Sequence, residues 1–167
     1  MPEERADADA APGDGRDETP NERSDRNWAE ILQELRATQT GTQILTGFLL
    51  AVAFQPAFAS LAPPELVFYL CLVTLAGLAT LTGLAPVIMH RQLFRHRQKA
   101  RLVRIGNAFL LTMLGIVSLL VAGVVAFVFD VTVSRAAGAV ALVVALVLVA
   151  AVWLAAPRLG RPDADGG

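Results

Sequence analysis

The residues best suited to chemistry lie together in the stretch MHRQLFRHRQKARLVR, residues 89–104, which holds two histidines and six fixed positive charges but no carboxylate. The six basic side chains are Arg91, Arg95, Arg97, Lys99, Arg101 and Arg104. Side chains of these types bind metals, sense voltage, contact nucleic acids or attract lipid phosphates. The spacing between them distinguishes these roles.

Three of the roles disagree with the spacing. His90 and His96 are six residues apart, whereas a helical metal pair is four apart, and no cysteine or acid joins them. The three-residue spacing of a voltage sensor is kept by Arg95, Gln98, Arg101 and Arg104. The gaps, however, hold His96, Arg97 and Lys99, which make the segment too polar to insert into a membrane. A nucleic-acid arm has interleaved aromatic residues, and Phe94 is the only one here. We therefore expect contact with lipid phosphates and no nucleic acid as a partner.

Long apolar runs surround this stretch and must position it. Four runs contain no acid and no fixed base, at residues 37–64, 66–90, 105–129 and 136–157. A helix of roughly 20 residues crosses the hydrocarbon core of about 30 Å, and none of the runs has the polar stripe of a soluble helix. The sequence predicts an all-α integral membrane bundle of four transmembrane helices. The predicted transmembrane domain, residues 39–157, has spans at about 40–61, 66–89, 105–129 and 136–156.

The distribution of basic residues predicts the orientation. Lys and Arg near the ends of spans stay on the cytoplasmic side. One side collects Arg23, Arg26, Arg36, the six bases of the loop, Arg158 and Arg161, and the other has only Arg135. We therefore expect a multi-pass protein of the cytoplasmic (inner) membrane with the N-terminus, the basic loop and the C-terminus in the cytoplasm. Lys and Arg beside a span attract anionic headgroups by about 1 kcal/mol each.

The segments outside the spans are polar. Residues 1–24 form an acidic tail with almost no large apolar side chain, and we expect this tail and residues 158–167 to be disordered. Residues 25–38 are predicted to form a short amphipathic helix, begun by Ser24 or Asp25 as its cap. Its apolar stripe consists of Trp28, Ile31, Leu32 and Leu35. This helix lies either on the cytoplasmic leaflet or against the basic loop, with Glu30 and Glu34 facing arginines of the loop.

The first predicted span is the least apolar of the four. Its polar cluster consists of Gln39, Thr40, Gln43 and Thr46. An amide in lipid needs a hydrogen-bond partner, so we expect Gln43 to face the interior of the bundle or a neighbouring subunit. Two interpretations stay open, a polar vestibule for ions and a hydrogen bond between helices.

Several kinds of chemistry are missing from the sequence. No Asp, Glu, Lys, Arg or His lies in the central part of a predicted span, where coupled ion transport usually needs a titratable group. The chain has no glycine-rich phosphate loop, nucleophile elbow or carboxylate pair. We expect no enzyme activity and no cofactor, and we identify no catalytic, cofactor-binding or metal-binding residue.

Two stretches, LQELRATQTGTQILTGFLLAVAF and APVIMHRQLFRHRQKARLVRIGNAFL, resemble an uncharacterised bacterial family of small four-span membrane proteins whose members are often labelled sodium:proton antiporters. The resemblance covers about residues 28–132. The residues that carry it are Gln33, Glu34, Leu35, Arg36, Gln39, Thr40, Gly41, Gln43, Ile44, Leu45, Pro86, His90, Arg91, Leu93, Phe94, Arg95, Lys99 and Asn107. It implies a bacterial membrane protein in which the polar cluster of the first span and the corner from His90 to Arg95 act together.

These observations predict a non-catalytic membrane protein that forms homo-oligomers and binds anionic lipid or a partner at its cytoplasmic face. The candidate contacts at that face are Glu34, Arg36, His90, Arg91, Arg95, Lys99, Arg101 and Arg104. The alternative is a small-ion transporter or channel component, in which the ion path passes Gln39, Gln43 and Thr46.

Overall fold

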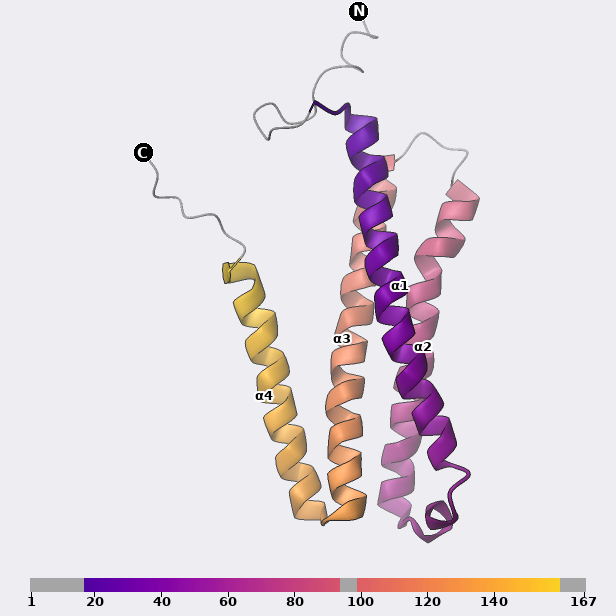
Figure 1. Cartoon of the computed structure of the whole chain (residues 1–167), viewed down its shortest axis with the longest axis vertical. Helices are drawn as coiled ribbons and strands as arrows, with labels where there is room; N and C mark the ends of the chain where they lie inside the picture. Colours follow the sequence, from indigo (N-terminus) through magenta and orange to yellow (C-terminus); the bar gives the residue numbers. More distant parts are fainter. Residues whose placement is uncertain (1–16, 94–98, 160–167) are drawn as a thin grey trace, which may run out of the picture. The chain divides into compact units, whose positions relative to one another are not determined.

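A computed structural model describes the backbone of residues 17–93 and 99–159, and the side chains within those ranges except those of residues 90–93, 99, 100, 102, 157 and 159 (Figure 1). The described elements are all helical: α1 (Pro20–Val52), the 3₁₀ helix η1 (Pro56–Ser60), α2 (Pro63–Leu93), α3 (Lys99–Thr132) and α4 (Arg135–Leu159). The all-α class is therefore confirmed. Residues 1–16, 94–98 and 160–167, with most of the predicted disordered tails, lie outside the described residues.

Three helices are long and apolar enough to cross a membrane: Pro63–Met89, Val103–Thr132 and Arg135–Ala156. They correspond to the predicted spans at 66–89, 105–129 and 136–156, and they indicate a membrane protein. Within the described residues, α1 does not reach the same apolarity. Its polar residues between Gln39 and Thr46 lower the apolarity of the segment, so the count of four spans is not confirmed.

The beginning of α1 differs from the prediction. The helix begins at Pro20, before the predicted cap at Ser24 or Asp25, and continues without a break to Val52. Thr19 and Glu22 form a reciprocal capping box, in which the Thr19 backbone N–H donates to Glu22 Oε2 at 2.9 Å and the Glu22 backbone N–H donates to Thr19 Oγ1 at 3.3 Å. Pro20 at the first helical position suits this start. The amphipathic segment and the first predicted span are thus one helix.

The end of α1 is closed by a tyrosine of α2. The carbonyl groups of Leu50, Ala51 and Val52 each accept a hydrogen bond from the backbone N–H group three residues further along the chain. The fourth open carbonyl, that of Leu49, accepts a hydrogen bond of 2.9 Å from the Tyr69 hydroxyl on α2. Because Pro56 then begins η1, the helix ends well before the predicted limit at residue 61.

Burial along the helices follows a heptad pattern. On α1 the side chains of Trp28, Leu35, Thr42 and Leu49 are buried at every seventh position. On α2 the buried residues follow one another at alternating intervals of three and four, at Tyr69, Leu72, Ala76, Ala79, Gly83 and Pro86. This spacing is typical of helices that pack side by side at a shallow angle, as in coiled coils.

The chain forms two compact units. Unit 1 comprises Met1–Leu45 and Gly77–Gly115, and its described part holds the first half of α1, the second half of α2 and the first half of α3. In unit 1 the Trp28 ring lies against Gly106, where a Cβ atom would be 2.5 Å from Trp28 Cζ3. Gly83 is covered in the same way by the ends of Gln39 and Met113. Large side chains thus fill the spaces left by glycines.

Unit 2 comprises Thr46–Ala76 and Ile116–Gly167. Its core contains an aromatic cluster, in which the ring of Tyr69 lies 5.0 Å from that of Phe58 and 6.0 Å from that of Phe127. A short turn after α3 leads into α4 (Figure 1). Gly138 is the only buried residue among the α4 positions with described side chains. Within unit 2, the aromatic cluster is therefore closely packed, whereas α4 is mostly exposed.

Candidate functional site

The predicted polar cluster of α1 is divided between different environments. Gln39 is half-buried in unit 1, with its amide nitrogen 2.8 Å from where a Cβ of Gly83 would lie. Thr40 and Gln43 are exposed, and Thr46 belongs to unit 2. Gln43 therefore does not face the interior of this chain, which leaves a neighbouring subunit as its expected environment.

The buried polar residue of α1 is Thr42, a residue that the sequence reasoning missed. Its side chain is 1 % exposed, and its hydroxyl donates to the Thr38 carbonyl at 2.9 Å. The seven-residue spacing from Trp28 through Leu35 was the signal that pointed to it. A hydroxyl satisfies its donor within its own helix and is therefore easier to bury than the amide of Gln43.

Threonine hydroxyls along this part of α1 bond back to the preceding turn. Thr38 donates to the Glu34 carbonyl at 2.8 Å, and Thr40 donates to the Arg36 carbonyl at 3.0 Å. Their protons are used within the helix, so toward a ligand these hydroxyls offer only acceptor lone pairs. The donors available on the surface of this segment are the side-chain amides and Arg36.

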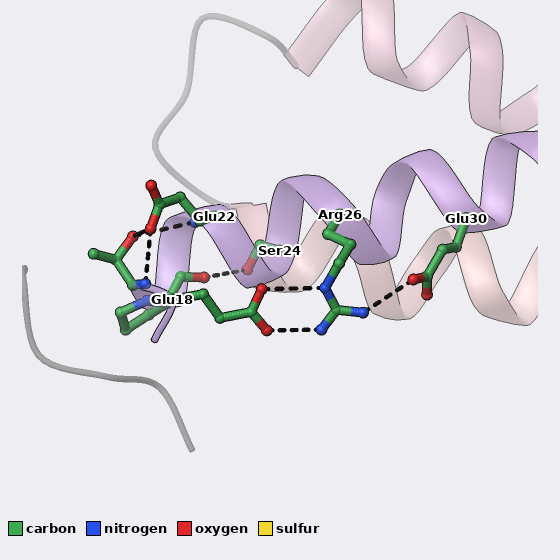
Figure 2. Close-up of polar contacts among 7 residues, drawn as sticks. Glu18, Glu22, Ser24, Arg26 and Glu30 are labelled. Atoms are coloured by element: carbon green, nitrogen blue, oxygen red, sulfur yellow. Dashed lines mark hydrogen bonds and ion pairs between the residues drawn. The ribbon is translucent and has the colours of Figure 1, made fainter. Parts of the chain in front are cut away.

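Arg26, near the start of α1, is already engaged by carboxylates (Figure 2). Its Nε and NH2 atoms donate to the two oxygens of Glu18 at 3.1 and 2.7 Å, and NH1 donates to Glu30 at 3.0 Å. The hydrogen bonds that Arg26 donates to Glu18 and then to Glu30 raise the pKa of Arg26. Glu30 is thus paired on its own helix. Of the loop arginines that it was expected to face, Arg101 and Arg104 have described side chains, and no ion pair joins Glu30 to either of them.

Arg36 has a different environment, although it lies on the same helix. Its side chain is exposed, and no ion pair joins it to a carboxylate in the described part of the chain. It borders an open surface hollow of about 680 Å³. The described residues that line this hollow, which we call the Arg36 hollow, are Ala29, Leu32, Gln33, Arg36, Ala37 and Thr40. None of them is acidic, so an anion would meet no repulsion from the lining.

The other predicted contacts are described only in part. Arg101 and Arg104 are exposed in the first turns of α3, and Glu34 is exposed on α1. The side chains of His90, Arg91, Arg95 and Lys99 lie outside the described residues. Over the described ranges, no group of three or more His, Cys, Asp or Glu residues is placed to hold a metal ion.

A second hollow, of about 710 Å³, lies between α3 and α4 in unit 2. Its lining is apolar throughout: Val121, Ala122, Val125, Phe129, Ala136, Ala137, Val140, Ala141, Val144, Ala145, Leu148 and Val149. Beyond its two ends, α3 and α4 approach each other where Gly138 meets Asp130 and where Trp153 Nε1 donates to Ser118 Oγ at 3.3 Å. The lining offers no group that would orient a polar substrate.

Comparison with known proteins identifies one family. A match to a family of unknown function, DUF6328, covers residues 17–157, which include all the described helices except the last residues of α4. No curated protein and no solved structure matches the chain.

Proposed function

We propose that this chain, which belongs to the DUF6328 family of unknown function, is a non-catalytic integral membrane protein that associates with copies of itself through α1. In this proposal α1 crosses the bilayer as a fourth span beside α2, α3 and α4. Both termini and the loop between α2 and α3 lie in the cytoplasm, where the basic face meets anionic lipid or a partner.

The observation that carries the proposal is the exposure of Gln43 in the middle of the apolar part of α1. An amide that faces hydrocarbon without a partner costs several kcal/mol, at roughly 2–7 kcal/mol for polar groups of this kind. Ile44 beside it is 70 % exposed, and Gly47 one turn further has open space around it. A second α1 can therefore approach closely and supply the hydrogen bond.

The weaker apolarity of α1 supports the same conclusion. A helix that is less apolar than its neighbours is stable in a membrane when other helices cover its polar positions. The buried stripe of α1 already covers Thr42, and the exposed polar side chains of the proposed span, Thr40 and Gln43, lie outside that stripe. Association through this second face would remove both from contact with lipid.

The Gln43→Leu variant tests association, with Asn107→Leu as a matched control because Asn107 is an exposed amide on α3. We expect the natural chain in lipid nanodiscs or mild detergent to cross-link as an oligomer, Gln43→Leu to shift it toward the monomer, and Asn107→Leu to have no effect. A monomeric natural chain, or a Gln43→Leu variant that still associates fully, would contradict the proposal.

Ion flux into reconstituted vesicles distinguishes the alternative. A sodium or proton flux that Gln43→Leu abolishes while the fold and the association persist would make the polar face a transport path instead. We expect no flux from the natural chain.

Reporter fusions test the fourth span. If α1 crosses the bilayer, reporters at the N-terminus and within residues 94–98 lie on the same, cytoplasmic side, and a reporter at Gln55 lies outside. Reporters at the N-terminus and the loop on opposite sides would show that α1 does not cross.

A further inference from the structure

We propose that the Arg36 hollow binds the phosphate of an anionic lipid headgroup, which deepens the proposed function and rests on its placement of α1 in the membrane. Two arginines of α1 differ in their partners. Arg26 already donates to two carboxylates, at 2.7 Å to Glu18 and at 3.0 Å to Glu30. Arg36 meets no carboxylate in the described part of the chain, so its positive charge is available to an external anion.

The chemistry of Arg36 suits a phosphate. A guanidinium group has five N–H donors in a planar fork that matches two phosphate oxygens at once, and it keeps its charge at every physiological pH. Gln33 is three residues before it and therefore lies on the same face of the helix, where its amide adds N–H donors. Glu34 is two residues away and projects to a different face, so it does not oppose an anion in the hollow.

The apolar residues of the hollow indicate a lipid and not a free phosphate ion. Ala29, Leu32 and Ala37 form its apolar lining, and the small alanines leave room beside the charged group. A volume of about 680 Å³ falls within the usual range of small-molecule sites. Because the proposed span follows Arg36, a lipid headgroup would place its phosphate at Arg36 and its glycerol backbone against Ala37, on the membrane side.

The position of Arg36 in the chain agrees with this ligand. It is the last charged residue of α1, because no acid or base follows before Glu65. An arginine at such a boundary extends its charged end toward the headgroups while its stem stays on the apolar surface. Gln43 is two turns further along the helix, so the Arg36 hollow adjoins the proposed association face at Thr40, which borders both.

The test measures lipid binding to the full chain with arginine variants matched in charge. The purified protein in detergent is titrated with phosphatidylglycerol or with phosphatidylcholine, and bound lipid is counted by native mass spectrometry. We expect preferential binding of phosphatidylglycerol and a loss of about fivefold in its affinity in Arg36→Gln, the size of one headgroup contact. Arg26→Gln removes the same charge from an arginine that is already paired, so its affinity should stay near that of the natural chain.

A second variant tests the hollow without changing charge. Ala37→Leu keeps a helix-forming residue but fills the space beside Arg36, and we expect it to weaken phosphatidylglycerol binding as well. An equal loss in Arg26→Gln and Arg36→Gln would overturn the proposal, because it would show general charge attraction. So would equal binding of phosphatidylcholine, or an unchanged affinity in Arg36→Gln.

Competition with inorganic phosphate distinguishes a lipid headgroup from a free phosphate ion as the ligand. Failure of inorganic phosphate to displace phosphatidylglycerol supports a lipid site, and displacement at millimolar concentration would overturn the lipid assignment. The reporter fusions and the Gln43→Leu experiment test the membrane arrangement separately. A failed lipid titration with the expected topology would therefore reject the Arg36 site alone.

Discussion

Two helix pairs of this chain pack very differently, and the more apolar pair is the looser one. In unit 1, α1 and α3 meet where the Trp28 ring covers Gly106, and the Trp28 side chain is only 8 % exposed. In unit 2, α3 and α4 approach each other at two places, and an apolar hollow of about 710 Å³ lies between the two helices. Trp153 of α4 is 41 % exposed.

The difference shows that apolarity alone does not pack helices in a membrane. Lipid tails are as apolar as leucine, so helices associate through close contact, in which a large side chain fills the space above a small one. Trp28 on Gly106 provides such a contact. The face of α4 toward the hollow consists of alanines, valines and Leu148, and the gap to α3 stays open.

The largest expected effect is that of Trp28→Ala, compared with Trp153→Ala as its exposed counterpart. Trp28→Ala would leave a cavity above Gly106 and lower the free energy of unfolding by about 3–5 kcal/mol. Trp153→Ala would change it by about 0.5 kcal/mol or less, as expected of an exposed side chain. Denaturant unfolding in mixed micelles measures both, and equal losses would break the comparison between the two helix pairs.

A matched pair of glycines on α3 sharpens the comparison within unit 1. At Gly106 a Cβ atom would collide with the rigid Trp28 ring, whereas Gly115 has open space around it. Gly106→Ala should therefore destabilise the protein by about 1–3 kcal/mol. Gly115→Ala should stabilise it by about 0.5–1 kcal/mol, because alanine is the better helix former. Melting temperatures of the two variants should move in opposite directions, and a shared direction would contradict the packing described.

Tyr69→Phe tests the hydrogen bond by which the aromatic cluster of unit 2 closes the end of α1. The variant keeps the ring contacts with Phe58 and Phe127 but leaves the Leu49 carbonyl without the hydroxyl that closes α1. We expect a loss of about 1 kcal/mol in the free energy of unfolding. Faster amide hydrogen exchange in the last turn of α1 would locate the effect, and unchanged exchange there would refute it.

The smallest expected effect is a pH dependence at the start of α1. Hydrogen bonds from the Thr19 backbone and then the Thr19 hydroxyl lower the pKa of Glu22 from its ordinary value of 4.5. Because the folded-state pKa is the lower one, the stabilisation is fully present above pH 4.5 and is lost as the pH falls through the folded-state value. Helical NMR shifts for the turn after Thr19 should weaken as the pH falls below 4.5 and through the folded-state pKa. Glu22→Gln should remove that dependence, and a persistent dependence would assign it to another group.

Much of the fold could be predicted from the sequence, because the hydropathy of a helix is the sum of its own residues. The spans in α2, α3 and α4 are of this kind. The early start of α1 was also present in the sequence, since Thr19, Pro20 and Glu22 form a capping box with proline at the first helical position. The prediction placed the start at Ser24 or Asp25 because both are good caps when considered alone.

The candidate site was less accessible to prediction. The choice between Thr42 and Gln43 as the buried polar residue depends on a rotation of one position about the helix axis, about 100°. The end of α1 depends on the Tyr69 hydroxyl, which lies 20 residues further along the chain. Part of the pairing of Arg26 depends on Glu18, which lies eight residues earlier and reaches it only in the folded chain. The freedom of Arg36 could be predicted, because no acid lies three or four positions from it.

The sequence by itself determined that the chain is helical, that it belongs in a membrane and that its positive charges gather at one loop, because these properties follow from local composition. Only the tertiary structure decided which faces of the helices meet and where a hollow remains between α3 and α4. These depend on contacts between residues far apart in the chain, and no sum over neighbouring residues contains them.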